Sequence, residues 1–244
     1  MSGRVQQTQA DFEQFQCVAE LTETHMQIVI GNVLSADEVI HVRDVLALAD
    51  YIDGRATAGF AARTVKNNRQ AANNPTIETV RKLVEERILA NDVFRLAVRP
   101  KKLSATLFSR YETGMQYGSH VDDALMQGMR TDVSFTLFLS NPGSYDGGEL
   151  VIESASGEDA VKLPAGSLVA YPSTALHHVS PVTRGERLAA VGWARSFVRD
   201  GAHREMLFDL DTARRQMFAK DGKTAEYDLV SKSLSNLLRM WVED

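Results

Sequence analysis

The sequence of 244 residues contains a single cysteine, Cys17, so no disulfide can form within the chain. This usage suits a reducing compartment, and we expect a cytoplasmic protein. No apolar run approaches the roughly 18 residues that a membrane-spanning helix needs, and the polar first ten residues do not resemble a signal peptide. Basic residues do not cluster, and the formal net charge is −5. We therefore expect neither a membrane nor a nucleic-acid partner.

The chain does contain clear helix signals before residue 95. Residues 35–38 (Ser-Ala-Asp-Glu) form a capping box, and the apolar residues that follow predict a helix that ends near Asp50. Asn74 and Pro75 begin a second predicted helix, with apolar residues at helical spacing to about Ala90. The intervening residues 54–74 are rich in glycine and amide side chains. They predict a long loop with one strand at most, and such loops are often functional.

From residue 96 the pattern changes to short segments of strand character that are separated by glycine and proline turns. The predicted strands cover residues 103–111, 131–139, 148–153, 160–163, 167–171, 177–183 and 187–198. Two helices are predicted after them, over residues 202–218 and 225–242. Many short, evenly spaced strands indicate a sandwich or jelly roll, so we expect a mainly β fold with flanking helices.

The pattern also predicts how the chain is organised along its length. We expect an N-terminal extension with one amphipathic helix, a helical region with the long loop, a sheet core and a pair of C-terminal helices. These parts cover residues 1–25, 26–95, 96–200 and 201–244.

Metal-ligand chemistry is indicated by His120 and Asp122, which lie two residues apart. In an extended segment their side chains leave the same face of the backbone. A third ligand would come from the adjacent pair His177 and His178, of which one alone can face the same way. Two histidines and one carboxylate leave open positions on octahedral Fe(II), as in non-haem iron oxygenases.

Arg187 opens the apolar strand predicted over residues 187–198, ten residues after His177. An arginine at such a place needs a reason, and a guanidinium fork that binds a carboxylate through two contacts is a good one. An ion pair at the strand start is the structural alternative.

These residues together resemble the Fe(II)/2-oxoglutarate dioxygenases, and in detail the bacterial PKHD-type hydroxylases of the PiuC/YbiX group. The segments that carry the resemblance are Tyr111-x-x-Gly114-x-x-Tyr117-x-x-His120-x-Asp122, residues 145–150, 163–172 and 176–185, the segments 53–55 and 65–68, and the ending 236–241. The likeness covers roughly residues 26–244. It implies a double-stranded β-helix, or jelly-roll, core.

The resemblance also implies roles for individual residues. Iron would be held by His120, Asp122 and His177, while His178 would lie at the entrance or surface. Arg187 would bind the far carboxylate of 2-oxoglutarate, and Tyr111 resembles the phenol that reaches the same carboxylate. The cofactor set would be Fe(II), 2-oxoglutarate as co-substrate and O2, with ascorbate left open as a further requirement.

The expected reaction is hydroxylation of a C–H bond with release of succinate and CO2. The substrate, a small molecule or a peptide, stays open, as does assembly into an oligomer. A non-catalytic cupin-like metal-binding or sensor protein would use the same sheet and ligands. Desaturation, demethylation and halogenation are further outcomes, and the presence of Asp122 argues against halogenation.

Other residues are candidates for the pocket. Tyr117 and Trp193 would line it, although both could be plain core aromatics. Four polar residues of the long loop would face the substrate, namely Lys66, Asn67, Asn68 and Arg69. A solvated loop is the alternative at these four positions.

Overall fold

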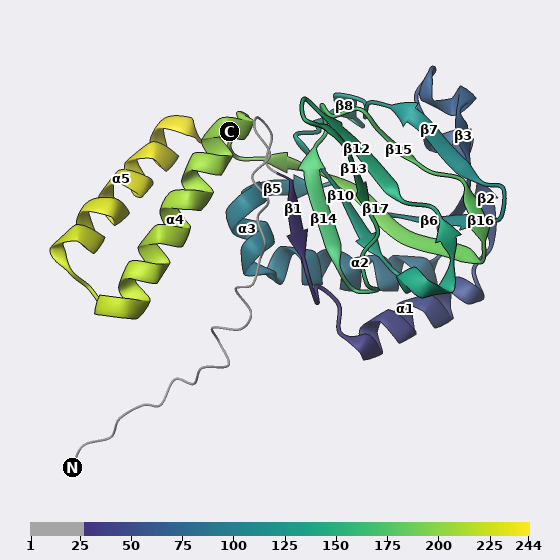
Figure 1. The fold of residues 1–244 in the computed structure, drawn as a ribbon, viewed down its shortest axis with the longest axis horizontal. Coiled ribbons are helices and arrows are strands. Elements are labelled where there is room, and N and C mark those ends of the chain that lie inside the picture. The colour runs from purple at the N-terminus through teal and green to yellow at the C-terminus, as the bar shows by residue number, and fades with distance from the viewer. Residues whose placement is uncertain (1–26) are drawn as a thin grey trace, which may run out of the picture.

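The fold is described by a computed structural model, which places residues 27–244. Two antiparallel sheets face each other, and helices cover the outer side of the larger one (Figure 1). The extension predicted over residues 1–25, with its amphipathic helix, lies outside the described residues.

The larger sheet has eight strands and the smaller sheet has five. The order in the larger sheet is β1 (Ile28–Ile30), β14 (Leu168–Pro172), β10 (Val133–Phe138), β17 (Glu186–Ser196), β6 (Leu107–Glu112), β4 (Arg69–Ala71) and β2 (Tyr51–Asp53), with β5 (Pro100–Leu103) also paired to β17. The order in the smaller sheet is β13 (Gly157–Val161), β12 (Leu150–Ser154), β15 (His177–Val179), β7 (Gln116–His120) and β3 (Lys66–Asn67). The two-stranded pairs are β11 (Asp146–Gly147) with β16 (Val182–Arg184), and β8 (Leu125–Met126) with β9 (Met129–Arg130). This arrangement confirms the predicted mainly β, jelly-roll fold.

Strand β10 contributes apolar side chains to both cores, one under the helices and one between the sheets. Val133, Phe135 and Leu137 belong to the apolar core under the helices, whereas Phe138 belongs to the core between the sheets. Successive side chains of a strand leave opposite faces. The hydroxyl residues Ser134 and Thr136 therefore point into the space between the sheets, where they line a pocket.

Local signals begin the helices where the sequence predicts them. The helices are α1 (Ala36–Ala47), α2 (Pro75–Ala90), α3 (Asp92–Val98), α4 (Gly201–Asp221) and α5 (Ala225–Trp241). The side chain of Ser35 caps α1 in a full capping box with Glu38, and Asn74 caps α2 ahead of Pro75. The buried faces of α1, α2 and α3 pack on the larger sheet.

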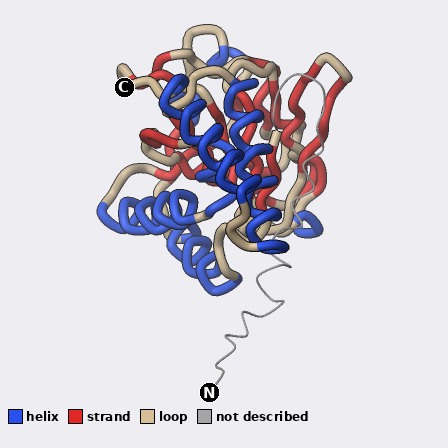
Figure 2. Tube along the Cα trace, turned by 90° about the vertical axis from the view of Figure 1, so that its left-hand side faces the viewer, coloured by secondary structure: helices blue, strands red, loops and turns tan. Residues whose placement is uncertain are grey.

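Helices α4 and α5 form a hairpin at one side of the body (Figure 1). Figure 2 views this side and shows the helices in front of the strands. Val198, Leu207 and Leu234 form a small core of their own there. None of the helices in residues 27–244 is long and apolar enough to cross a membrane.

The local structure differs from the predictions in several places. Residues 54–74 are not a loop with one strand, because they contain two short 3-10 helices, η3 (Gly54–Thr57) and η4 (Ala62–Thr64), and the strands β3 and β4. Helix α3, capped by Asn91, was not predicted. The strand expected over residues 103–111 is interrupted between β5 and β6. Strands β3, β4 and β5 pair with strands that are distant in the sequence, so no local pattern specifies them. Helix α3 does have a local signal, because the Asn91 side chain accepts a hydrogen bond from the Phe94 amide.

Candidate active site

Two histidines meet because strands β7 and β15 are neighbours in the smaller sheet. His120 ends β7, His177 begins β15, and the antiparallel register places them directly opposite each other. Their ring centroids are 4.3 Å apart. Residues 57 positions apart in the sequence therefore present two imidazoles side by side.

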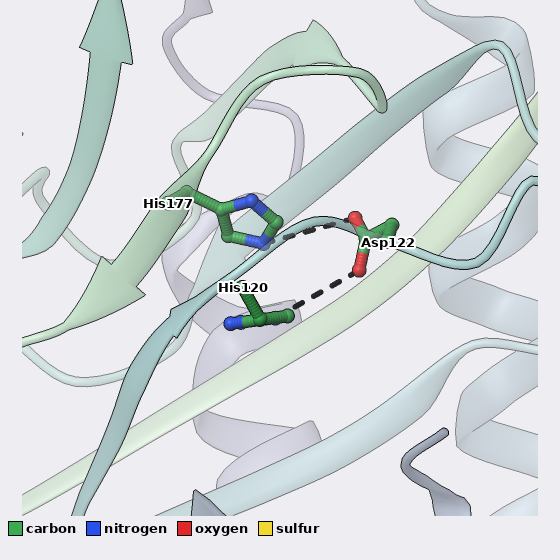
Figure 3. A group of neighbouring side chains, drawn as sticks. All are labelled: His120, Asp122 and His177. Carbon is green, nitrogen blue, oxygen red and sulfur yellow. Dashed lines mark ion pairs between the residues drawn. The ribbon is translucent and has the colours of Figure 1, made fainter. Parts of the chain in front are cut away.

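Asp122 completes the group from the segment that follows β7. Its Oδ1 lies 3.9 Å from Nε2 of His120, and its Oδ2 lies 3.7 Å from Nε2 of His177 (Figure 3). The three ligand atoms all lie within 4.8 Å of one another. Such a set can hold a divalent metal ion and leave coordination positions open for other ligands.

Backbone carbonyl groups orient both imidazoles. Nδ1 of His120 lies 2.9 Å from the Gly118 carbonyl oxygen, and Nδ1 of His177 lies 3.0 Å from that of Ala175. A carbonyl oxygen only accepts, so each Nδ1 carries the proton and each Nε2 offers its lone pair. Burial, followed by the charge of His177, lowers the pKa of His120 to about 4. His120 is therefore neutral at pH 7, the form that binds a metal.

A serine that sequence reasoning missed holds the carboxylate. The Ser134 hydroxyl donates to Oδ2 of Asp122 over 2.6 Å, and its oxygen lies 2.9 Å from that of Ser173. Ser134 lies on β10, in the larger sheet. The available signal was a hydroxyl at every second position of an otherwise apolar strand, which marks its polar inner face.

Arg187 is buried without a counter-ion. Its side chain is 1% exposed, and the guanidinium carbon lies 5.1 Å and 5.3 Å from the ring centroids of Tyr111 and Phe138. Nε and one terminal nitrogen have no hydrogen-bond partner, and no carboxylate of residues 27–244 lies within ion-pair distance. Burying an unpaired cation is costly. The guanidinium of Arg187 therefore fits an acidic ligand that enters the pocket.

The other expected pocket aromatics surround these groups. Tyr111 lies opposite Arg187 across the β6–β17 pair, and burial raises the pKa of its hydroxyl, which stays protonated and able to donate. Tyr117 stacks on His120 with a centroid distance of 3.7 Å. Trp193 follows on the Arg187 face of β17 and also lines the pocket. This intersheet pocket holds about 750 Å³ of empty space, part of it open to solvent.

The four polar residues predicted to face the substrate divide into two pairs. Lys66 and Asn68 are buried and line the intersheet pocket. Asn67 and Arg69 are exposed and do not line it, which differs from the prediction. Asn67 donates to the Gly114 carbonyl, and Arg69 lies 4.0 Å from Glu112. The physical reason is strand alternation, since neighbouring residues leave opposite faces.

His178 lies apart from the metal-ligand group. It is paired across the sheet with Val151, and the group of close ligand atoms contains His177 instead. As neighbours on β15, the two histidines leave opposite faces of the strand. The geometry therefore agrees with the expectation that His177 faces the site.

Comparison with known proteins shows the general class of enzyme to which this chain belongs. Residues 106–195 match the 2OG-Fe(II) oxygenase superfamily, and residues 201–243 match the PKHD-type hydroxylase C-terminal domain. A Pseudomonas putida prolyl-4-hydroxylase structure is 25% identical, with a TM-score of 0.51 over 71% of this chain and 94% of that one. HygX from Streptomyces hygroscopicus, solved with nickel and 2-oxoglutarate bound, shares the fold at 19% identity, with a TM-score of 0.52 over 73% and 89% of the two chains. Fold and site therefore define a 2OG-Fe(II) oxygenase.

A relative with higher sequence identity than these two structures shows the family within that class. A PKHD-type hydroxylase of Picosynechococcus sp. is 52% identical over 215 residues, which are 88% of this chain and 98% of the relative. The chain belongs to the PKHD-type hydroxylases, and it is an oxidoreductase enzyme. The family depends on Fe(II) and 2-oxoglutarate.

Proposed function

We propose that this enzyme hydroxylates a C–H bond of a small-molecule or peptidyl substrate and converts 2-oxoglutarate to succinate and CO2. One oxygen atom of O2 would enter succinate and the other the product hydroxyl. A single observation carries the proposal. The buried guanidinium of Arg187, which has no counter-ion in residues 27–244, lines the same pocket as the His-Asp-His group. A protein that only binds a metal has no need of such a group.

The donor set fits both cofactors. His120, Asp122 and His177 would hold Fe(II), which accepts imidazole and carboxylate ligands. Arg187 would pair with the far carboxylate of 2-oxoglutarate, and Tyr111 would donate a hydrogen bond to it. When bound, Fe(II) and 2-oxoglutarate supply with O2 the oxidising power that a C–H bond requires.

The chain itself contributes placement. The Gly118 and Ala175 carbonyls orient both imidazoles through Nδ1, so that Nε2 of each faces the metal position, and Ser134 holds the Asp122 carboxylate in one orientation. Burial of Arg187 against two aromatic rings excludes the water that would otherwise weaken its pairing with a carboxylate. The substrate C–H bond would be held in the rest of the intersheet pocket.

Spectroscopy and product analysis test the proposal in sequence. Purified protein with Fe(II) and 2-oxoglutarate, without oxygen, should show a weak visible charge-transfer band from the chelated keto acid. On admission of oxygen, with and without ascorbate, succinate should form, and a metabolite screen should find compounds that accelerate it. The Arg187→Met variant should bind iron and lose the band at the same 2-oxoglutarate concentration. Iron binding without the band in the parent protein would favour a metal sensor.

A further inference from the structure

The segment from Lys66 to Gln70 joins the two sheets at one edge of the intersheet pocket. Strand β3 pairs with β7 in the smaller sheet, β4 pairs with β6 in the larger one, and the single residue Asn68 lies between them. Lys66, Asn68 and Gln70 are 8%, 4% and 3% exposed, and all three line the pocket. One wall of the pocket is therefore a row of buried polar side chains.

The ammonium group of Lys66 is incompletely paired. Nζ donates to the Thr57 hydroxyl over 3.1 Å and lies 4.8 Å from the centroid of the Tyr117 ring. An ammonium has three N–H donors. Within residues 27–244, neither a second hydrogen-bond acceptor nor a carboxylate within 4.0 Å is found for it. The Thr57 hydroxyl lies 2.8 Å from Oε1 of Gln70, so it is held in place as an acceptor for Lys66.

Lys66 is also close to the metal-ligand group. Its ammonium lies over Tyr117, and Tyr117 stacks on His120, so one aromatic ring separates the cation from a candidate ligand. Burial lowers the pKa of Lys66 to about 8, and the charge of Asp122 opposes that shift. The side chain is still mainly protonated at pH 7.

The buried charges that line the pocket sum to one positive charge. Lys66 and Arg187 contribute two positive charges, and Asp122 contributes one negative charge. The other lining carboxylate, Asp123, is exposed and therefore screened by solvent. Bound Fe(II) and 2-oxoglutarate carry charges of +2 and −2, so loading the site leaves this surplus unchanged. Arg187 is the partner of 2-oxoglutarate in the proposed function, and Lys66 has no assigned partner.

We propose that Lys66 anchors a carboxylate of the substrate, so that the enzyme selects substrates with one negative charge close to the C–H bond that is oxidised. This inference rests on the proposed function, because it takes Arg187 as the partner of 2-oxoglutarate. The Lys66 ammonium has two N–H donors without an acceptor among residues 27–244, and the pocket carries a surplus of one positive charge, so a monoanion suits it. A phosphate dianion would need further cations that this wall does not offer. The exposed residues Asn67 and Arg69 take no part.

The test uses full-length protein loaded with Mn(II) and saturating 2-oxoglutarate. The probes are butyrate and its neutral isostere butyramide, and the readout is the paramagnetic relaxation of their proton signals by Mn(II). Butyrate protons should relax faster than butyramide protons in the parent protein. Lys66→Met, which keeps an apolar stem against Tyr117, should weaken butyrate binding at least about tenfold, or ~1.4 kcal/mol. The matched control Arg69→Met, from the exposed side of the same segment, should leave butyrate binding unchanged.

The outcomes separate this inference from the proposed function. If the parent protein fails to bind Mn(II) with 2-oxoglutarate, the proposed function fails. If both bind but butyrate and butyramide relax equally, the carboxylate anchor is refuted, and this comparison needs no variant. Equal loss in Lys66→Met and Arg69→Met would likewise refute it. Lys66-dependent binding of methyl phosphate in place of butyrate would overturn the choice of a carboxylate.

Discussion

The hydrogen bond from Ser134 to Asp122 offers a quantitative test of how the site holds its carboxylate. Ser134 is 2% exposed, and shortening its side chain to alanine removes the hydroxyl that donates to the Asp122 carboxylate. A hydrogen bond to a charged group is worth about 1.5–3 kcal/mol. That free energy corresponds to roughly 10–150-fold in an equilibrium constant, and loss of an outer partner of a metal ligand costs about 10–100-fold in metal affinity. Ser134→Ala should therefore weaken metal binding by about 10–100-fold.

Calorimetric titration of Co(II) into metal-free protein measures this change. Ser140→Ala is the matched control, because Ser140 is equally buried, follows the same strand, and accepts a hydrogen bond from the Leu188 amide rather than contacting a metal ligand. It should bind Co(II) as the parent does, even if its melting temperature falls. If Ser134→Ala also binds Co(II) as tightly as the parent while retaining its fold, the assignment of Asp122 as an oriented ligand is wrong.

Three further outcomes follow from the same geometry. His120→Ala and His177→Ala should each abolish measurable Co(II) binding in the calorimeter, whereas His178→Ala should retain it; the reverse pattern for the two adjacent histidines would exchange their roles. Arg187→Met should leave Co(II) affinity unchanged and weaken 2-oxoglutarate binding by about 30-fold or more, because it removes the partner of a buried charge; a titration of the charge-transfer band in the Fe(II) protein measures this. The pKa of Lys66 is about 8 in the fold and about 10.5 when unfolded. Between these values the unfolded chain binds the extra proton, so the parent should gain stability relative to Lys66→Met as pH rises from about 8 to 10.5, by at most about 3 kcal/mol. Urea unfolding of both proteins at pH 7.5 and at pH 10 measures this gain in the free energy of unfolding. If the difference in free energy between the two proteins is the same at both pH values, the lowered pKa of Lys66 is contradicted.

Local chemistry was sufficient to predict the elements whose signals are complete within a few residues. The capping box at Ser35 and the Asn74-Pro75 start act on the first turn of their own helices, so α1 and α2 were predictable. The alternation in β10 marks its two faces in the same way. The spacing of His120 and Asp122 similarly predicts two ligands close together, although in the fold His120 ends β7 and Asp122 lies just after it.

Distant pairings decided what the sequence could not. Residue pattern alone left His177 and His178 open, and the resemblance to a family chose between them; in the fold, the register of β15 on β7 places His177 opposite His120. Likewise, residues 66–69 are one polar cluster in the sequence, and pairing with β7 and β6 buries Lys66 and Asn68 while it exposes Asn67 and Arg69.

The sequence by itself therefore determined which chemical groups are present and which of them share a strand face, because strand period is a local property. Only the tertiary structure decided which face lies in the pocket. It also decided that Ser134, from the other sheet, holds the Asp122 carboxylate, and that Lys66 and Arg187 are buried without carboxylate partners among residues 27–244. Burial and pairing depend on strands that are brought together over long sequence separations, and those contacts set the charge of the pocket.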